Sequence, residues 1–179
     1  MNVPPIVPFV GKSDSGKTTF LEKVIRELKQ RGYRVAVIKH HGHATQVDQP
    51  GKDTWRHAQA GADQVVIASP VQLALFATME QELSPDEIVA RYLDDADIVL
   101  TEGYKRAHKP KIEVNRVARS SELICDEEEL LAVVSDQCFP IDRPQFDLDD
   151  ATGVVDLLER TFGLGKGSDG SNKHGKGRS

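Results

Sequence analysis

The residue types that could do chemistry lie close together near the start of the chain, in the stretch Gly11-Lys12-Ser13-Asp14-Ser15-Gly16-Lys17-Thr18-Thr19. An apolar run at 6–10 precedes this stretch, and an amphipathic segment follows it from Phe20. The order of strand, G-x-x-x-x-G-K-T loop and helix is that of a phosphate-binding loop. Its glycines let the backbone approach an anion closely, and the N–H groups of the new helix point at that anion. The sequence therefore predicts a nucleoside triphosphate site.

Each polar group in this loop has a predicted task. The Lys17 ammonium reaches the β- and γ-phosphates, and the Thr18 hydroxyl is a ligand of Mg²⁺. The alternative is a glycine turn before an ordinary helix, and the correct strand and helix on either side argue against it. The predicted nucleotide contacts are Gly11, Ser13, Ser15, Gly16, Lys17, Thr18 and Thr19.

A second predicted site residue is Glu102, which ends the apolar run at 98–101 and is followed by Gly103. A buried strand that ends in an acid is typical of the element that supports Mg²⁺ opposite a phosphate loop. The carboxylate would hold the metal through water or orient the attacking water. The alternative is a solvated acid at a strand end. The predicted catalytic pair is thus Lys17 with Glu102, and the predicted metal pair is Thr18 with Glu102.

Three further polar segments allow more than one interpretation. The histidines His40, His41 and His43 could ligate a metal, contact an anionic ligand or partner, or lie in a polar loop. The loop at 48–53 is either a switch that senses the γ-phosphate or an ordinary surface loop. The basic segment at 105–111 is either an anion site beside the nucleotide or a solvated loop.

The residues specify the base only weakly. A guanine-binding motif usually ends in an aspartate that accepts from the base, but no Asn-Lys-x-Asp occurs in this chain. Asp136, which follows the last apolar strand, is the predicted substitute. The choice between GTP and ATP stays open on these grounds.

Strands and helices that alternate must position these groups. Apolar runs predict strands at 34–39, 65–68, 73–77, 98–103, 112–117 and 130–135, besides the first at 6–10. Helical periodicity predicts helices at 16–30, 54–60, 84–94 and from 149 or 150 to 162. The pattern predicts a P-loop NTPase-like α/β fold, a doubly wound and mostly parallel sheet with an antiparallel pair at 65–77. The nucleotide would lie at the carboxyl ends of the strands.

Composition narrows the class of protein. A chain of 179 residues with 39% hydrophobic residues fits one domain, predicted over 1–162, with a disordered glycine- and lysine-rich tail over 163–179. The net charge of the chain is −5, and the tail carries +3, so the remainder carries −8. An acidic body argues against nucleic-acid binding. No run is long enough for a membrane span, and no secretion signal is visible. Cys125 and Cys138 are expected to be reduced thiols of a cytoplasmic protein.

The chain resembles the molybdopterin-guanine dinucleotide biosynthesis adaptor family, MobB. Matching segments occur in the family's order over about residues 6 to 160. They are 11–19, Val-Ile-Lys-His-His at 37–41, 47–54 with Pro-Gly-Lys-Asp, 60–62, Glu-Gly-Tyr-Lys at 102–105, and 110–114. One departure is Asp14, where the family often has Asn or Gly, because it places a negative charge near the phosphates.

The resemblance implies a homodimeric protein that binds GTP with Mg²⁺ and hydrolyses it slowly. It also implies a partner, the guanylyltransferase MobA, which joins GMP to molybdopterin, and contact with molybdopterin itself is a further possibility. On this interpretation the chain is at most a slow GTPase. The alternatives are a P-loop kinase of a small metabolite and a GTPase that delivers metal to an enzyme.

The phosphate-loop assignment makes a direct prediction. Lys17→Ala removes a charge-assisted hydrogen bond worth roughly 1.5–3 kcal/mol, so GTP affinity should fall about tenfold to a hundredfold. Titration calorimetry measures this change. Unchanged GTP binding by the variant would contradict the placement of Lys17.

Overall fold

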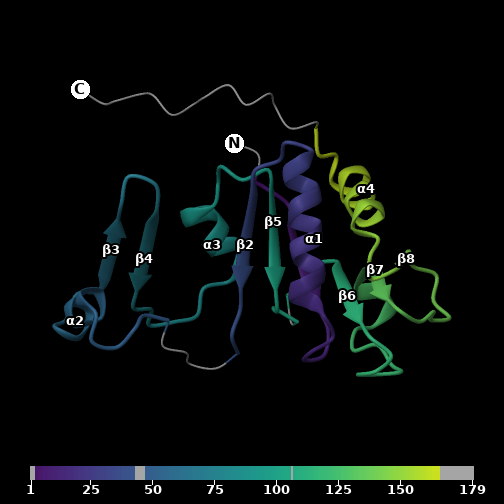
Figure 1. The fold of residues 1–179 in the computed structure, drawn as a ribbon, viewed down its shortest axis with the longest axis horizontal. Helices are drawn as coiled ribbons and strands as arrows, with labels where there is room; N and C mark the ends of the chain where they lie inside the picture. Colours follow the sequence, from purple (N-terminus) through teal and green to yellow (C-terminus); the bar gives the residue numbers. More distant parts are fainter. Residues whose placement is uncertain (1–2, 43–46, 106, 166–179) are drawn as a thin grey trace. The chain divides into compact units, whose positions relative to one another are not determined.

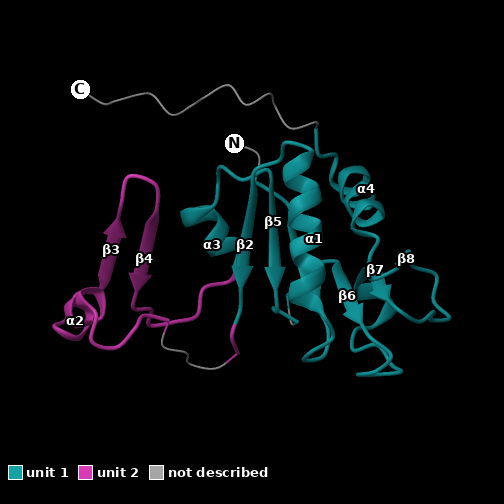
Figure 2. Cartoon of the chain, viewed as in Figure 1, with its two compact units in different colours: residues 1–40, 85–179 teal, residues 41–84 magenta. Residues whose placement is uncertain are grey.

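The computed structural model describes residues 3–42, 47–105 and 107–165, and the predicted tail beyond 165 lies outside the described residues. The chain forms two compact units, one made of residues 1–40 with 85–179 and the other of residues 41–84 (Figure 2). The first unit contains the phosphate loop and Glu102. The second is an insertion between the second strand of the chain and its third helix.

The first unit is built on a six-stranded sheet with the order β2-β5-β1-β6-β7-β8 (Figure 1). Every pairing described within this sheet is parallel, so the carboxyl ends of all its strands share one edge. The phosphate-loop strand β1 lies between β5 and β6, as expected for the middle of a doubly wound sheet. The strands are β1 (Ile6–Val10), β2 (Val35–Lys39), β5 (Ile98–Glu102), β6 (Lys111–Asn115), β7 (Leu130–Ser135) and β8 (Gln145–Phe146).

Helices cover both faces of this sheet. Val7 and Phe9 of β1 face a core that includes residues of α1 (Lys17–Gln30) and α4 (Ala151–Phe162). Ile6 faces the opposite way, into a core with Val99 and Val89 of α3 (Pro85–Tyr92). Neighbouring residues alternate between the two cores because strand side chains alternate between faces. The predicted doubly wound fold is therefore confirmed.

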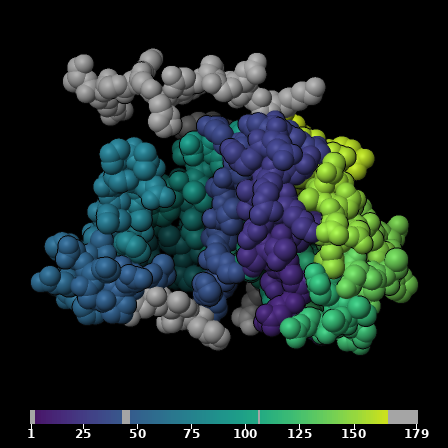
Figure 3. Space-filling model, in the orientation of Figure 1, coloured from purple at the N-terminus to yellow at the C-terminus, as the bar shows by residue number. Residues whose placement is uncertain are grey.

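The helices α1 and α4 pack on each other on the same face of the sheet, and Figure 3 shows them side by side. Leu28, Val154 and Leu158 are completely buried in their shared core. The Asp150 carboxylate caps α4 by accepting from the Gly153 N–H at 2.8 Å, which confirms the predicted start of that helix. This core fixes the axis of α1 and hence the direction in which its first turn points.

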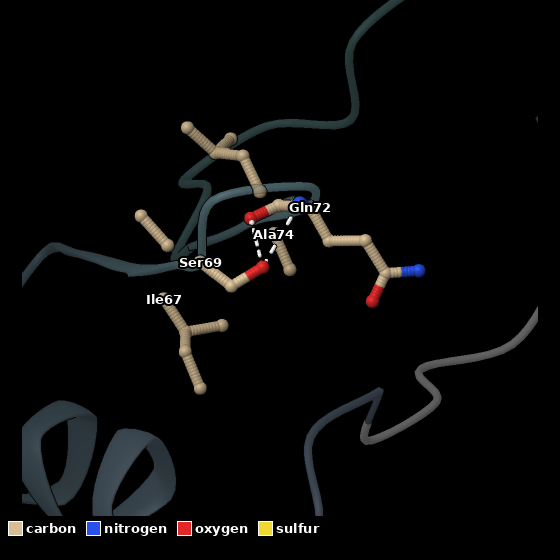
Figure 4. A pocket seen from close by; sticks show the side chains of 6 residues that line it. Ile67, Ser69, Gln72 and Ala74 are labelled. Carbon is tan, nitrogen blue, oxygen red and sulfur yellow. Dashed lines mark hydrogen bonds between the residues drawn. The ribbon is translucent and has the colours of Figure 1, made fainter.

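The second unit contains α2 (Asp53–Gln59) and an antiparallel hairpin of β3 (Gln64–Ala68) and β4 (Leu73–Ala77), which confirms the predicted antiparallel pair. Ser69 closes the turn, because its hydroxyl accepts from the Gln72 N–H at 2.9 Å (Figure 4). Several apolar side chains of this hairpin are exposed, with Leu73 at 71% and Ile67 at 55%.

Three elements differ from the sequence-based expectation. The strand β8 was not predicted, since two residues carry no periodicity, and a 3₁₀ turn at Glu127–Glu129 precedes β7. The predicted strand at 112–117 ends earlier, at Asn115, because the next residues form a turn in which the Arg116 carbonyl accepts from Arg119 and Ser120. Within the described part of the chain, no helix is long and apolar enough to cross a membrane.

Candidate nucleotide site

The loop between β1 and α1 has the backbone that the two glycines predict. Gly11 has φ +151°, and a Cβ there would lie 2.2 Å from the Val114 carbonyl oxygen of β6. Gly16 has φ +90° and precedes the first residue of α1. Any side chain at Gly11 would therefore push β6 away from β1, and one at Gly16 would strain the start of the helix.

The loop also explains the departure at Asp14. Asp14 has φ +58°, in the left-handed region that Gly, Asn and Asp adopt most readily. Asn or Gly at this position would satisfy the same backbone requirement. The Asp14 carboxylate is largely exposed, and Arg119 lies 3.8 Å from it. The extra negative charge thus has a cation beside it.

The polar groups of the loop are suited to an anion. The first N–H groups of α1 have no carbonyl partner within the helix, and the Gly16 carbonyl accepts the first helical bond from Phe20. The Ser15 hydroxyl is buried and has no partner among the described residues. Ser13 is exposed on the loop, and Thr19 is exposed in the first turn of α1. A phosphate would supply the acceptors that these donors lack.

Lys17 is bonded back onto the loop. Its ammonium donates to the Lys12 carbonyl at 2.6 Å. Burial lowers the pKa of Lys17, and the positive charges of Lys105 and Lys39 lower it further. The negative charge of Glu102 opposes this shift. The ammonium is thus close to other cations and to the carboxylates of Glu102 and Asp14, in a place where an added anion would be stabilised.

Glu102 lies at the carboxyl end of β5, opposite Phe9 of β1 on one side and Lys39 of β2 on the other. Its residue is 8% exposed. The Thr18 hydroxyl donates to Glu102 Oε1 at 2.9 Å, and the Lys39 ammonium donates to the same oxygen. The tertiary structure therefore brings together Thr18 and Glu102, the two residues predicted to support Mg²⁺.

The donors around Glu102 keep it ionised. Burial by itself would raise its pKa, but the bonds from Lys39 and Thr18 and the charges of Lys39 and Lys17 hold that pKa below its ordinary value. A hydroxyl and a carboxylate are oxygen ligands of the kind that Mg²⁺ takes beside phosphates. The residues present thus fit a magnesium-bound triphosphate.

The segment that follows β6 adds basic residues which the sequence did not assign to the site. The Arg116 guanidinium lies 3.4 Å from the position that a Gly16 Cβ would take, and the Lys12 ammonium donates to the Ser120 hydroxyl at 2.7 Å. The sequence does show that Arg116 directly follows a buried strand. It does not show that this strand neighbours β1, so Arg116 could not be assigned to the site from the sequence.

A buried carboxylate anchors the same segment. The Glu113 carboxylate accepts from the backbone N–H groups of Ile124 and Cys125 at 2.9–3.1 Å. Burial raises the pKa of the Cys125 thiol to about 12, and the neighbouring Glu113 charge adds to the effect. The segment beside the phosphate loop is therefore held by β6 itself.

Asp136 lies at the carboxyl end of β7, on the far side of β6 from the phosphate loop. One of its carboxylate oxygens accepts from the Val117 N–H at 2.7 Å. Asp136 lies on the same sheet edge as the phosphate loop, but no hydrogen bond joins the two among the described residues. Its assignment to the base stays a prediction.

Several side chains of the histidine segment at 40–43 and the basic segment at 105–111 contact other residues of the chain. The His40 ring stacks on Tyr104 with centroids 4.3 Å apart, whereas His41 is exposed and His43 lies outside the described residues. No group of three or more His, Cys, Asp or Glu side chains that could hold a metal occurs among the residues the structure describes. In the basic segment, Lys109 pairs with Asp86 and Lys111 with Glu129, while Arg106 is not described.

The predicted switch loop lies in the second unit. Asp48 and Trp55 line a cavity of about 380 Å³ together with apolar residues of β4. One carboxylate oxygen of Asp48 and the Trp55 indole nitrogen are buried without a partner among the described residues. A switch role for the loop stays a prediction.

Comparison with known proteins adds independent findings. Residues 6–136 match the family model described as Molybdopterin guanine dinucleotide synthesis protein B. The molybdopterin-guanine dinucleotide biosynthesis adapter protein of Haemophilus influenzae is 38% identical over 156 residues, which is 87% of this chain and 88% of the relative. The adapter protein of Escherichia coli is 36% identical over 160 residues, covering 86% and 91%.

Solved structures agree with these matches. A crystal structure of molybdopterin-guanine biosynthesis protein B superposes with a TM-score of 0.68 and 33% identity, covering 87% of this chain and 99% of the other. The crystal structure of Bacillus subtilis MobB superposes with a TM-score of 0.67 and 28% identity, covering 87% and 97%. The phosphate loop, Glu102 and the strands between them all lie inside the residues matched by the family model.

Proposed function

Because this chain belongs to the molybdopterin guanine dinucleotide synthesis protein B family, we propose that it is a GTP-binding adaptor for the guanylyltransferase step of molybdenum cofactor synthesis. The observation that carries the proposal is the contact of Thr18 with Glu102 beside the phosphate loop, in a chain 36–38% identical to adapter proteins. The proposal places this step in the cytoplasm.

Different residues of the chain would contact different parts of the bound nucleotide. The backbone from Gly11 to Thr19 surrounds the phosphates, and the Lys17 ammonium turns from the Lys12 carbonyl to the β- and γ-phosphates. Thr18 and Glu102 would hold magnesium, which would supply positive charge to the phosphates. Asp136 is the proposed acceptor for the guanine base.

Hydrolysis at this site should be slow. Glu102 is a weak general base, because its two donors lower its pKa and already occupy one of its oxygens. Unassisted GTP hydrolysis at comparable sites runs on the order of 10⁻⁴ to 10⁻² per second. Slow turnover suits an adaptor that is active while GTP is bound, and it favours this function over a metabolite kinase.

The metal-delivery alternative finds less support in the described residues. The His40 ring is stacked on Tyr104, and its backbone N–H donates to the Glu102 carbonyl at 2.9 Å. This contact makes His40 part of the packing next to the carboxylate. The family matches favour the adaptor function as well.

Homodimer formation is part of the proposal, and the hairpin of the second unit supports it. Val66, Ile67, Val71 and Leu73 are 54–88% exposed on β3, β4 and their turn. Exposed strands with apolar side chains are typical of surfaces that pair with another chain. A second copy of this chain would cover them.

Nucleotide binding can be tested by thermal melting. GTP with Mg²⁺ at about a hundred times its dissociation constant should add about 2.7 kcal/mol and raise the melting midpoint by roughly 5–10 °C. ATP should shift the midpoint much less, and Lys17→Ala should lose about half of the GTP shift or more. A larger shift with ATP than with GTP would contradict the assignment of the base.

The adaptor function predicts a complex with the guanylyltransferase from the same organism. Analytical ultracentrifugation of the two purified proteins should show joint sedimentation that strengthens with GTP and Mg²⁺. Lys17→Ala is the matched control, and its complex should not respond to GTP. If the two proteins sediment separately under every nucleotide condition, the chain is not an adaptor for that enzyme.

The dimer prediction concerns the hairpin. Leu73→Lys places a charge on an exposed apolar strand residue, so the dimer should dissociate at micromolar concentrations where the unmodified protein stays dimeric. Gln30→Lys adds the same charge at an exposed position at the end of α1, outside the hairpin, and should leave the dimer intact. Light scattering after size-exclusion chromatography measures both masses. An unmodified protein that is monomeric throughout would refute the dimer.

A further inference from the structure

Lys39 makes a contact that neither the phosphate-loop motif nor the acid at the end of β5 accounts for. The parallel register sets Lys39 directly opposite Glu102, and its ammonium donates to Oε1 of that carboxylate. The same oxygen accepts from Thr18 at 2.9 Å. A cation from the protein therefore lies beside the two groups that would support magnesium.

Magnesium held by Thr18 and Glu102 would weaken this ion pair. Two cations beside one carboxylate repel each other, so the Lys39 ammonium would be held less firmly by Glu102 and would be available to a nearby anion. The Lys39 backbone is held in the ladder with β5, and the next residue donates to the Glu102 carbonyl. Only the four-carbon side chain is able to move, and it is 48% exposed.

Strand order indicates what Lys39 would contact next. In the order β2-β5-β1-β6-β7, the strands of Glu102 and Lys39 lie on one side of the phosphate-loop strand. Asp136, the proposed base acceptor, follows β7 on the other side. A nucleotide whose base lies toward β7 therefore directs its terminal phosphate toward β5 and β2.

We propose that Lys39 is a specificity-determining residue for the triphosphate, neutralising Glu102 in the empty site and pairing with the terminal phosphate of the bound nucleotide. The inference rests on the proposed function, since it takes GTP with Mg²⁺ as the ligand. It adds a residue that distinguishes GTP from GDP, because GDP lacks the phosphate that Lys39 reaches.

The test compares GTP and GDP binding by titration calorimetry in excess Mg²⁺. Lys39→Gln keeps an N–H donor for Glu102 but loses the charge, so GTP affinity should fall about tenfold to a hundredfold and GDP affinity less than about threefold. Lys39→Arg keeps the charge and should retain more of the GTP preference than Lys39→Gln does. Circular dichroism melting confirms that each variant is folded.

Lys105→Met is the matched charge control. The charge of Lys105 also acts on Lys17, but Lys105 forms no bond to Glu102 in the part of the chain that the structure describes. Its loss should weaken GTP and GDP binding by similar factors. An equal effect of Lys39→Gln on GTP and GDP, or no effect, would overturn the inference while the proposed function stands. Unmodified protein that binds neither nucleotide would refute both.

Discussion

The site depends on one buried carboxylate and the groups that neutralise it. An ionised acid removed from water is costly unless charged or hydrogen-bonding partners surround it. Glu102 has both, because Lys39 reaches it from β2 and Thr18 reaches it from the first turn of α1. The same contacts that stabilise this acid therefore connect the sheet to the phosphate loop.

Parallel strand pairing makes this connection possible. In a parallel sheet the carboxyl ends of neighbouring strands meet at one edge, so residues far apart in the sequence lie side by side. Lys39 and Glu102 are 63 positions apart, yet they are direct neighbours across two strands. The cores on both faces hold the sheet and α1 in place. The phosphate loop between β1 and α1 is therefore fixed at both ends, and its N–H donors remain available to an anion.

Much of the fold could be predicted because strong local patterns mark its central elements. The alternating strands and helices of the first unit and the antiparallel hairpin of the second are confirmed, along with the Asp150 cap. The short strand β8 was missed, and the strand of β6 was extended too far. Short or irregular pieces are specified by their neighbours in space, so a pattern along the chain does not reveal them.

The phosphate loop and the acid at the end of β5 are visible from the sequence alone, because their chemistry depends on residue types at close and regular spacing. Three further findings came only from the tertiary structure: the cation beside Glu102, the position of Arg116 near Gly16, and the ion pairs of Lys109 and Lys111. Each depends on which strands are neighbours or on which distant acid a lysine meets. Such contacts are decided by packing across the whole domain, and no local spacing encodes them.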